Sequence, residues 1–73
     1  MITTDIIRIA SAGGGLYIDC TNRIVADLVR MANAARVGGG YIYFENTSKL
    51  LVEEKVRIAS AGKGHVVFMD VIR

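Results

Sequence analysis

Hydrophobic positions recur with helical spacing in two stretches of the chain. They are Ile24, Leu28, Met31 and Ala35, at i, i+4, i+7 and i+11, and Val52, Val56 and Ala59, at i, i+4 and i+7. Such spacing places apolar side chains on one side of a helix. The pattern therefore predicts two amphipathic helices, and a similar but shorter stretch predicts a third near residues 4–12.

Three short runs rich in β-branched and aromatic residues follow these helices. They are Leu16–Asp19, Ile42–Glu45 and Val66–Met69. This composition is typical of β-strands. Strands that alternate with helices predict an α/β protein with parallel strand pairing and right-handed crossovers.

Polar and glycine residues mark the expected helix ends. The pairs Thr3-Thr4, Thr21-Asn22 and Thr47-Ser48 carry side-chain oxygens that can accept from the free N–H groups of a first helical turn. Gly13, Gly38 and Gly62 fall where a helix ends in a residue of positive φ.

The sequence repeats itself. Arg8–Gly13 reads RIASAG and recurs unchanged as Arg57–Gly62, while the related RMANA begins at Arg30. These matches divide the single domain into units of approximately residues 3–20, 21–46 and 47–73. Units of similar geometry predict a three-stranded parallel sheet of order 1-2-3, with the helices mainly on one face, in a solenoid-like array.

Alternation along the strands assigns side chains to the two faces of this sheet. The set expected beneath the helices is Leu16, Ile18, Ile42, Phe44, Val66 and Phe68. The set expected on the opposite face is Tyr17, Asp19, Tyr43, Glu45, Val67 and Met69, with Tyr41 and His65 at the strand starts. This assignment leaves both carboxylates on the open face, where they stay hydrated.

The strand segments resemble the central Leu-x-Leu portion of leucine-rich repeats. The matching residues are Leu16-x-Ile18-x-x-Thr21, Ile42-x-Phe44-x-x-Thr47 and Val66-x-Phe68-x-x-Val71. The preceding leucine position of that pattern holds Gly13, Gly39 and Lys63 instead, so the resemblance covers only these three segments. It implies a binding scaffold without catalysis.

The size of the chain makes self-association an expectation. A domain of 73 residues has a marginal core and usually needs a disulfide, a metal or a partner. One Cys excludes an internal disulfide, and one Cys with one His does not supply a zinc site. Oligomerisation is the remaining source of stability. The lone Cys20 also favours a cytoplasmic location, and the sequence shows neither a membrane span nor a signal peptide.

Polar residues collect where the strands end, which is where open α/β sheets bind ligands. They are Asp19, Cys20, Thr21, Asn22, Glu45, Asn46, Thr47, Ser48 and Asp70. Helix capping accounts for this set without a ligand, and a cation or small-molecule site is the less favoured interpretation.

Three arginines recur at one position of the repeat. Arg8, Arg30 and Arg57 could contact nucleic-acid phosphates, but Asp5, Asp27 and Glu54 precede them by three residues and can neutralise them.

No residues assemble a nucleophile, a base and an orienting group, so the sequence predicts neither an enzyme nor a cofactor. The favoured function is a non-enzymatic protein interaction module that associates, first of all with itself, through its sheet face or strand edges. The expected interface residues are Tyr17, Tyr41, Tyr43, His65, Val67 and Met69, because aromatic residues and Met are enriched at interfaces. The alternative function is nucleic-acid binding by the three arginines.

Overall fold

The computed structural model describes residues 1–70, which form three helices and three strands. In chain order these are α1 (Thr3–Ser11), β1 (Leu16–Asp19), α2 (Val25–Gly38), β2 (Ile42–Glu45), α3 (Val52–Gly62) and β3 (Val66–Phe68). The strands pair in parallel in the order β1-β2-β3. The predicted α/β class, the parallel pairing and the strand order are therefore confirmed, while residues 71–73 of the third unit lie outside the described residues.

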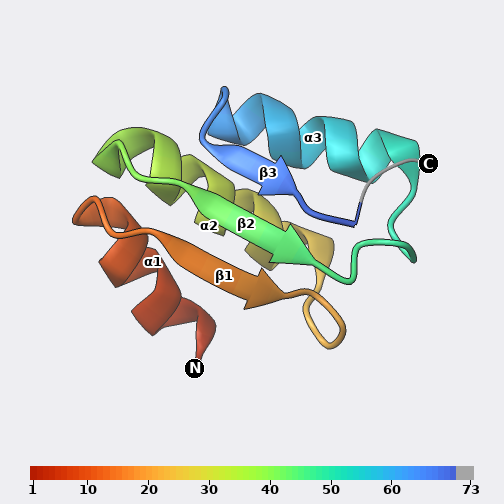
Figure 1. The fold of residues 1–73 in the computed structure, drawn as a ribbon, viewed down its shortest axis with the longest axis horizontal. Helices are drawn as coiled ribbons and strands as arrows, with labels where there is room; N and C mark the ends of the chain where they lie inside the picture. Colours follow the sequence, from red (N-terminus) through yellow and green to blue (C-terminus); the bar gives the residue numbers. More distant parts are fainter. Residues whose placement is uncertain (71–73) are drawn as a thin grey trace.

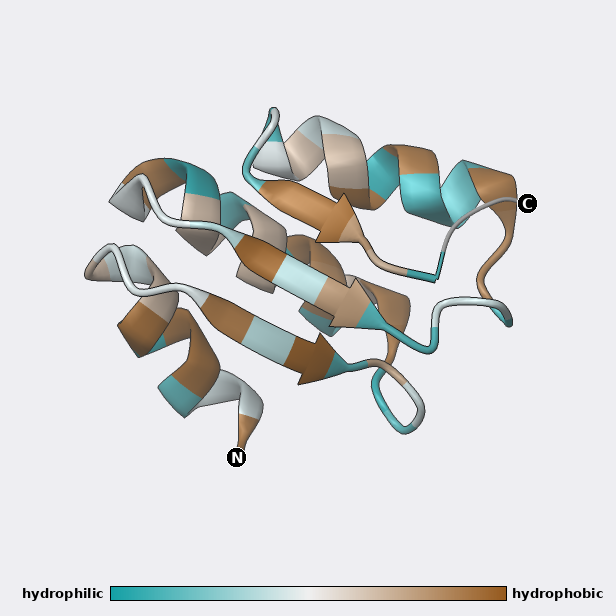
Figure 2. Ribbon diagram, in the orientation of Figure 1, coloured by the Kyte–Doolittle hydropathy of each residue, from teal (hydrophilic) through white to brown (hydrophobic). Residues whose placement is uncertain are grey.

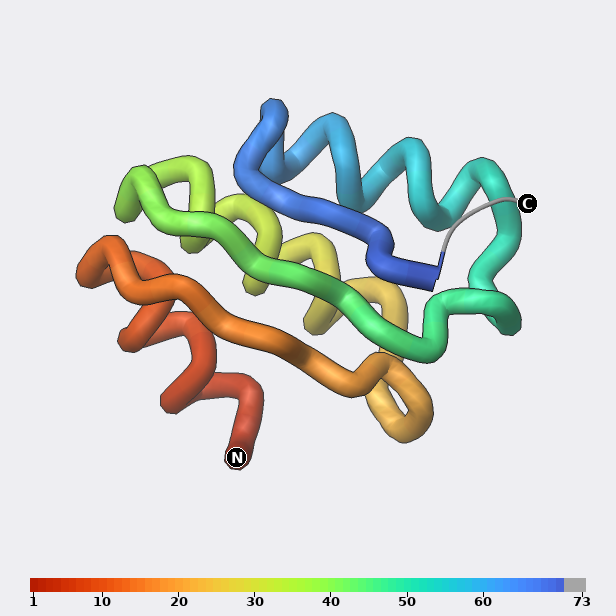
Figure 3. Tube along the Cα trace, viewed as in Figure 1, coloured from red at the N-terminus to blue at the C-terminus, as the bar shows by residue number. Residues whose placement is uncertain are grey.

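The chain winds three times from helix to strand. In the view of Figure 1 the three helices lie behind the three strands. The tube in Figure 3 shows the three turns side by side, from α1 and β1 at one end to α3 and β3 at the other. Helix α2 packs against both α1 and α3, so within residues 1–70 the central unit has a neighbour on each side and the first and third units have one each.

The two faces of the sheet carry the predicted sets of side chains. The set expected beneath the helices is buried or half-buried, and Phe44 and Phe68 stack with ring centroids 5.9 Å apart. On the other face Tyr17, Asp19 and Val67 are exposed. Along β1 and β2 in Figure 2, strongly hydrophobic residues alternate with paler ones, whereas β3 is hydrophobic throughout.

The first helix begins at Thr3, within the predicted pair Thr3-Thr4, but the predicted starts of the second and third helices and the predicted side-chain caps are wrong. The residues before the three helices are Ile2, Ile24 and Leu51, in extended conformation, and none makes a side-chain capping hydrogen bond. The pairs Thr21-Asn22 and Thr47-Ser48 precede their helices by several residues because the chain must first cross from the sheet to the helix layer. In the third unit, Glu54 accepts a hydrogen bond of 2.8 Å from the backbone N–H of Leu51 and stabilises that helix start instead.

The predicted helix ends are correct for one helix and one residue early for two. Gly13 follows α1 with φ +95°, as expected. Gly38 and Gly62 are the last residues of their helices, and the positive φ falls on Gly39 and Lys63. A Cβ on Gly38 would lie 2.0 Å from the carbonyl oxygen of Ala10, so glycine here permits the close approach of α1 and α2.

The apolar stripe predicted for the third helix faces solvent. Val52, Val56 and Ala59 are exposed, whereas Ile58 and Gly62 face the interior. Among the described residues α3 has α2 as its helical neighbour, on one side, and its second apolar side is exposed. In the second helix Leu28, Met31 and Ala35 are buried as predicted, but Ile24 is exposed before the helix begins.

Candidate interaction surface

Tyrosines of neighbouring strands form a pair on the face of the sheet that carries the exposed Asp19 and Val67. Tyr17 of β1 and Tyr43 of β2 are directly opposite in the parallel register, and their ring centroids lie 5.1 Å apart at a tilt of 41°. Tyr17 is 68% exposed, and Tyr43 is half-buried beside it. The alternation of strand side chains places both rings here, and their mutual contact orders them before any partner binds.

A second aromatic pair lies at the starts of β2 and β3. Tyr41 and His65 have ring centroids 5.4 Å apart, and Nδ1 of His65 lies 2.8 Å from the carbonyl oxygen of Gly40. The carbonyl can only accept, so Nδ1 carries a proton and donates it. This hydrogen bond holds the imidazole ring in place, where it packs against the ring of the exposed Tyr41.

Two apolar side chains at the third strand complete the surface. Val67 lies opposite Tyr43 in the register, and Met69 follows the end of β3; both are exposed. Together with the two aromatic pairs they form what we call the aromatic face: Tyr17, Tyr41, Tyr43, His65, Val67 and Met69. The strand register thus places residues of all three units side by side on this surface.

The polar residues at the strand ends are engaged with one another. Oδ1 of Asp19 accepts hydrogen bonds from the backbone N–H and hydroxyl of Thr21, at 2.9 and 2.6 Å, and from Nδ2 of Asn46, at 3.0 Å. These bonds, first the one from the Thr21 hydroxyl and then the one from Asn46, lower the pKa of Asp19 to about 2. Asp19 therefore links the loop after β1 to the loop after β2.

Asp70 makes the corresponding link between the second and third units. Its carboxylate accepts from the hydroxyl of Thr47 at 2.6 Å and from the Thr47 backbone N–H at 2.7 Å. The hydrogen bond from the Thr47 hydroxyl is the main reason that the pKa of Asp70 is lowered. The strand-end residues thus act as ties between loops, and residues 1–70 hold no group of three or more His, Cys, Asp or Glu placed to bind a metal ion.

Cys20 is buried at this same edge. Its Sγ lies 4.0 Å from the carbonyl oxygen of Ile18, and burial, followed by the charges of Asp19 and Asp70, raises the pKa of the thiol to about 11. A thiol of this kind stays protonated and is a poor nucleophile at neutral pH.

The three repeat arginines are exposed. Within residues 1–70, one of these arginines forms an ion pair with the acid three residues earlier: Nη1 of Arg30 lies 3.5 Å from Oδ1 of Asp27. The carboxylate of Glu54 is instead engaged with the backbone of Leu51. The expected neutralisation of each arginine by the acid three residues earlier is thus observed in the central unit.

Sequence reasoning missed two apolar patches at the ends of the molecule. One lies beside α1 and includes the exposed Met1 and Ile9, which line the same depression; the other lies at the start of α3 and includes the exposed Leu51, Val52 and Val56. The repeated RIASAG segment could have indicated the first patch, because Ile9 is exposed in α1 while the equivalent Ile58 is buried in α3.

No protein-family model, curated protein or solved structure matches this chain. No helix in residues 1–70 combines the length and the apolar character needed to cross a membrane.

Proposed function

We propose that this chain is a non-enzymatic protein interaction module that binds a partner protein, and first of all a second copy of itself, through the aromatic face. In this proposal the three helix–strand units form a solenoid-like array, whose helices cover mainly one face of the sheet and leave the other for binding. A free, buried Cys20 suits a reducing cytoplasmic location for such a module.

The observation that carries the proposal is the pair formed by Tyr17 and Tyr43, with ring centroids 5.1 Å apart on the open face. Parallel sheets are usually covered on both faces. When a second protein removes an uncovered aromatic surface from water, the free energy of the system falls, which favours binding. Rings already packed against each other lose little conformational freedom on binding, which favours their use as contact residues.

Light scattering over a concentration series tests this proposal, with the native chain compared with Tyr43→Lys and with Val37→Lys as the control. Both positions belong to the central unit, but Val37 is an exposed residue of α2. We expect the native chain and Val37→Lys to reach the same mass, above that of one chain, and Tyr43→Lys to reach a lower mass than either. Equal masses for all three proteins would refute binding of a second copy through this face.

The second candidate is nucleic-acid binding by Arg8, Arg30 and Arg57. It is favoured by the exposure of all three arginines and by a sequence pI of about 9.0. Binding of this kind would weaken steeply with salt, because each phosphate contact releases counterions. A fluorescence titration of duplex DNA with the native chain and with Arg30→Glu tests it, and salt-independent or absent binding would remove this candidate.

A further inference from the structure

The three helices carry equivalent residues at equivalent positions. When they are aligned on Arg8, Arg30 and Arg57, each helix has an acid three residues before the arginine and alanines two and four residues after it. The three arginines are all exposed, as equivalent positions should be. Residues at the same number of positions before or after these arginines therefore point in equivalent directions.

One side of α1 points toward the following unit, and α2 and α3 carry equivalent residues on the corresponding side. This side contains the residues one and five positions before the arginine, which are Ile7 and Thr3 in α1, Val29 and Val25 in α2, and Val56 and Val52 in α3. In α1 the hydroxyl of Thr3 donates to Asp27 of α2 at 3.4 Å, and Ile7 lines a shallow depression together with Ala34 of α2. These residues are half-buried in α1 and α2, but in α3 Val52 and Val56 are 70% and 56% exposed.

The other side of α2 and of α3 points toward the preceding unit, and α1 carries equivalent residues on the corresponding side. This side contains the residues one and four positions after the arginine, which are Ile9 and Ala12 in α1, Met31 and Ala34 in α2, and Ile58 and Ala61 in α3. The carbonyl oxygen of Ala61 accepts from Nε of Arg36, in α2, at 3.2 Å. Met31, Ala34 and Ile58 are buried and Ala61 is half-buried.

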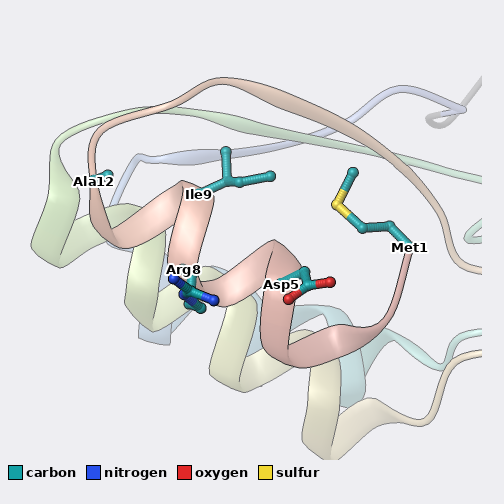
Figure 4. A pocket seen from close by; sticks show the side chains of 5 residues that line it. All are labelled: Met1, Asp5, Arg8, Ile9 and Ala12. Atoms are coloured by element: carbon teal, nitrogen blue, oxygen red, sulfur yellow. The ribbon is translucent and has the colours of Figure 1, made fainter.

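In α1, which has no preceding unit among the described residues, the same side is open. Ile9 is 38% exposed, and with Ala12, Met1 and Asp5 it lines an open depression along the outer side of the helix. Figure 4 shows Ile9 and Met1 projecting into the same open space beside α1. The uncovered side of α1 is thus equivalent to the sides of α2 and α3 that pack against the preceding unit.

We propose that the exposed side of α3 in one copy binds the exposed side of α1 in a second copy, so that copies associate head to tail. Each half of this contact already exists inside the molecule, since α1 uses the equivalent of Val56 to bind α2, and α3 uses the equivalent of Ile9 to bind α2. The outer edges of β3 and β1 then come together with the same polarity, because all strands are parallel. This extends the parallel sheet across the two copies and covers two strand edges.

The two halves of this contact are different surfaces, so it is heterologous and leaves one free end on each terminal copy. It deepens the proposed function, on which it rests for the claim that the partner is a second copy, but it uses the ends of the array rather than the aromatic face. The two contacts can therefore be tested separately.

The test uses sedimentation velocity on variants made in the Tyr43→Lys background, in which the aromatic face is disabled. Ile9→Glu blocks the α1 end, Val56→Glu blocks the α3 end, and Val37→Glu places the same charge on an exposed valine at neither end. We expect the parent and Val37→Glu to associate, and each end variant alone to sediment as one chain. An equimolar mixture of the two end variants should form a species of two chains, because each supplies the surface that the other lacks.

Association of both end variants at the level of the parent would overturn the head-to-tail contact, as would a mixture that stays at the mass of one chain. A parent that is itself a single chain at all concentrations would also overturn it, and would leave the aromatic face to be judged on the native chain. Circular dichroism confirms that each variant is folded, and Ala12→Glu, at an exposed position on the same side of α1, replaces Ile9→Glu if the latter unfolds.

Discussion

Thr47 and Asp70 bind each other through two hydrogen bonds, one from the threonine hydroxyl at 2.6 Å and one from its backbone N–H at 2.7 Å. Thr47 is fully buried, and Asp70 lies beyond the end of β3. The pair therefore ties the long loop between β2 and α3 to the last strand. Since the acceptor is ionised, both bonds are stronger than hydrogen bonds between neutral groups.

Replacing Thr47 by valine removes one of the two bonds while keeping the side-chain shape. We expect Thr47→Val to lower the free energy of unfolding by about 1–2 kcal/mol. Urea denaturation followed by circular dichroism measures this change. Ser48→Ala, at the exposed neighbouring position, is the control and should leave the unfolding midpoint where it is.

The lowered pKa of Asp19 makes part of the stability depend on pH. An unfolded aspartate has a pKa of about 3.9, so ionised Asp19 stabilises the fold fully above that value. This contribution is lost as pH falls from about 4 toward the folded pKa of about 2. Urea midpoints of the native chain and of Asp19→Asn should therefore differ at pH 7 and converge by pH 2; a constant difference across this range would contradict the assignment.

The thiol of Cys20 should be unreactive while the chain is folded. Its pKa of about 11 and its burial leave almost no accessible thiolate at pH 8. We expect a disulfide reagent such as dithionitrobenzoate to react with the native chain far more slowly than with the urea-unfolded chain. Equal rates in the two states would show that the thiol is accessible.

Gly38 should tolerate no side chain. A Cβ there would lie 2.0 Å from the carbonyl oxygen of Ala10, so Gly38→Ala must push α1 away from α2. We expect a loss of about 3 kcal/mol, at the upper end of the usual cost of overpacking. Gly15→Ala is the matched control, because its Cβ would meet nothing closer than 3.7 Å, and thermal unfolding compares the two.

The sequence predicted the strands and their two faces because alternation is a strong local signal. Ile18 and Phe44 point inward and Tyr17 points outward, as the pattern of apolar and charged positions requires. The starts of α2 and α3 were not predicted, because the distance from the sheet edge to the helix layer is a property of the whole fold. That distance places Thr47 in a loop, where its hydroxyl binds Asp70 rather than a helix end.

The error in α3 has a different cause. Val52, Val56 and Ala59 form a regular apolar stripe, and spacing alone cannot tell which of two apolar sides of a helix meets the core. The burial of Ile58 depends on a neighbour, α2, that is present on one side only. The aromatic face, in contrast, lies on one side of short strands, and its residues could be named from the sequence.

The central claim, that copies of this chain bind one another through the aromatic face, is tested most directly by recording ¹⁵N–¹H spectra of the native chain over a dilution series. We predict concentration-dependent shifts for Tyr17, Tyr43 and Val67, and none for Val37 on the helix layer. Spectra that do not change with concentration, in a sample that light scattering shows to be a single chain, would contradict the claim.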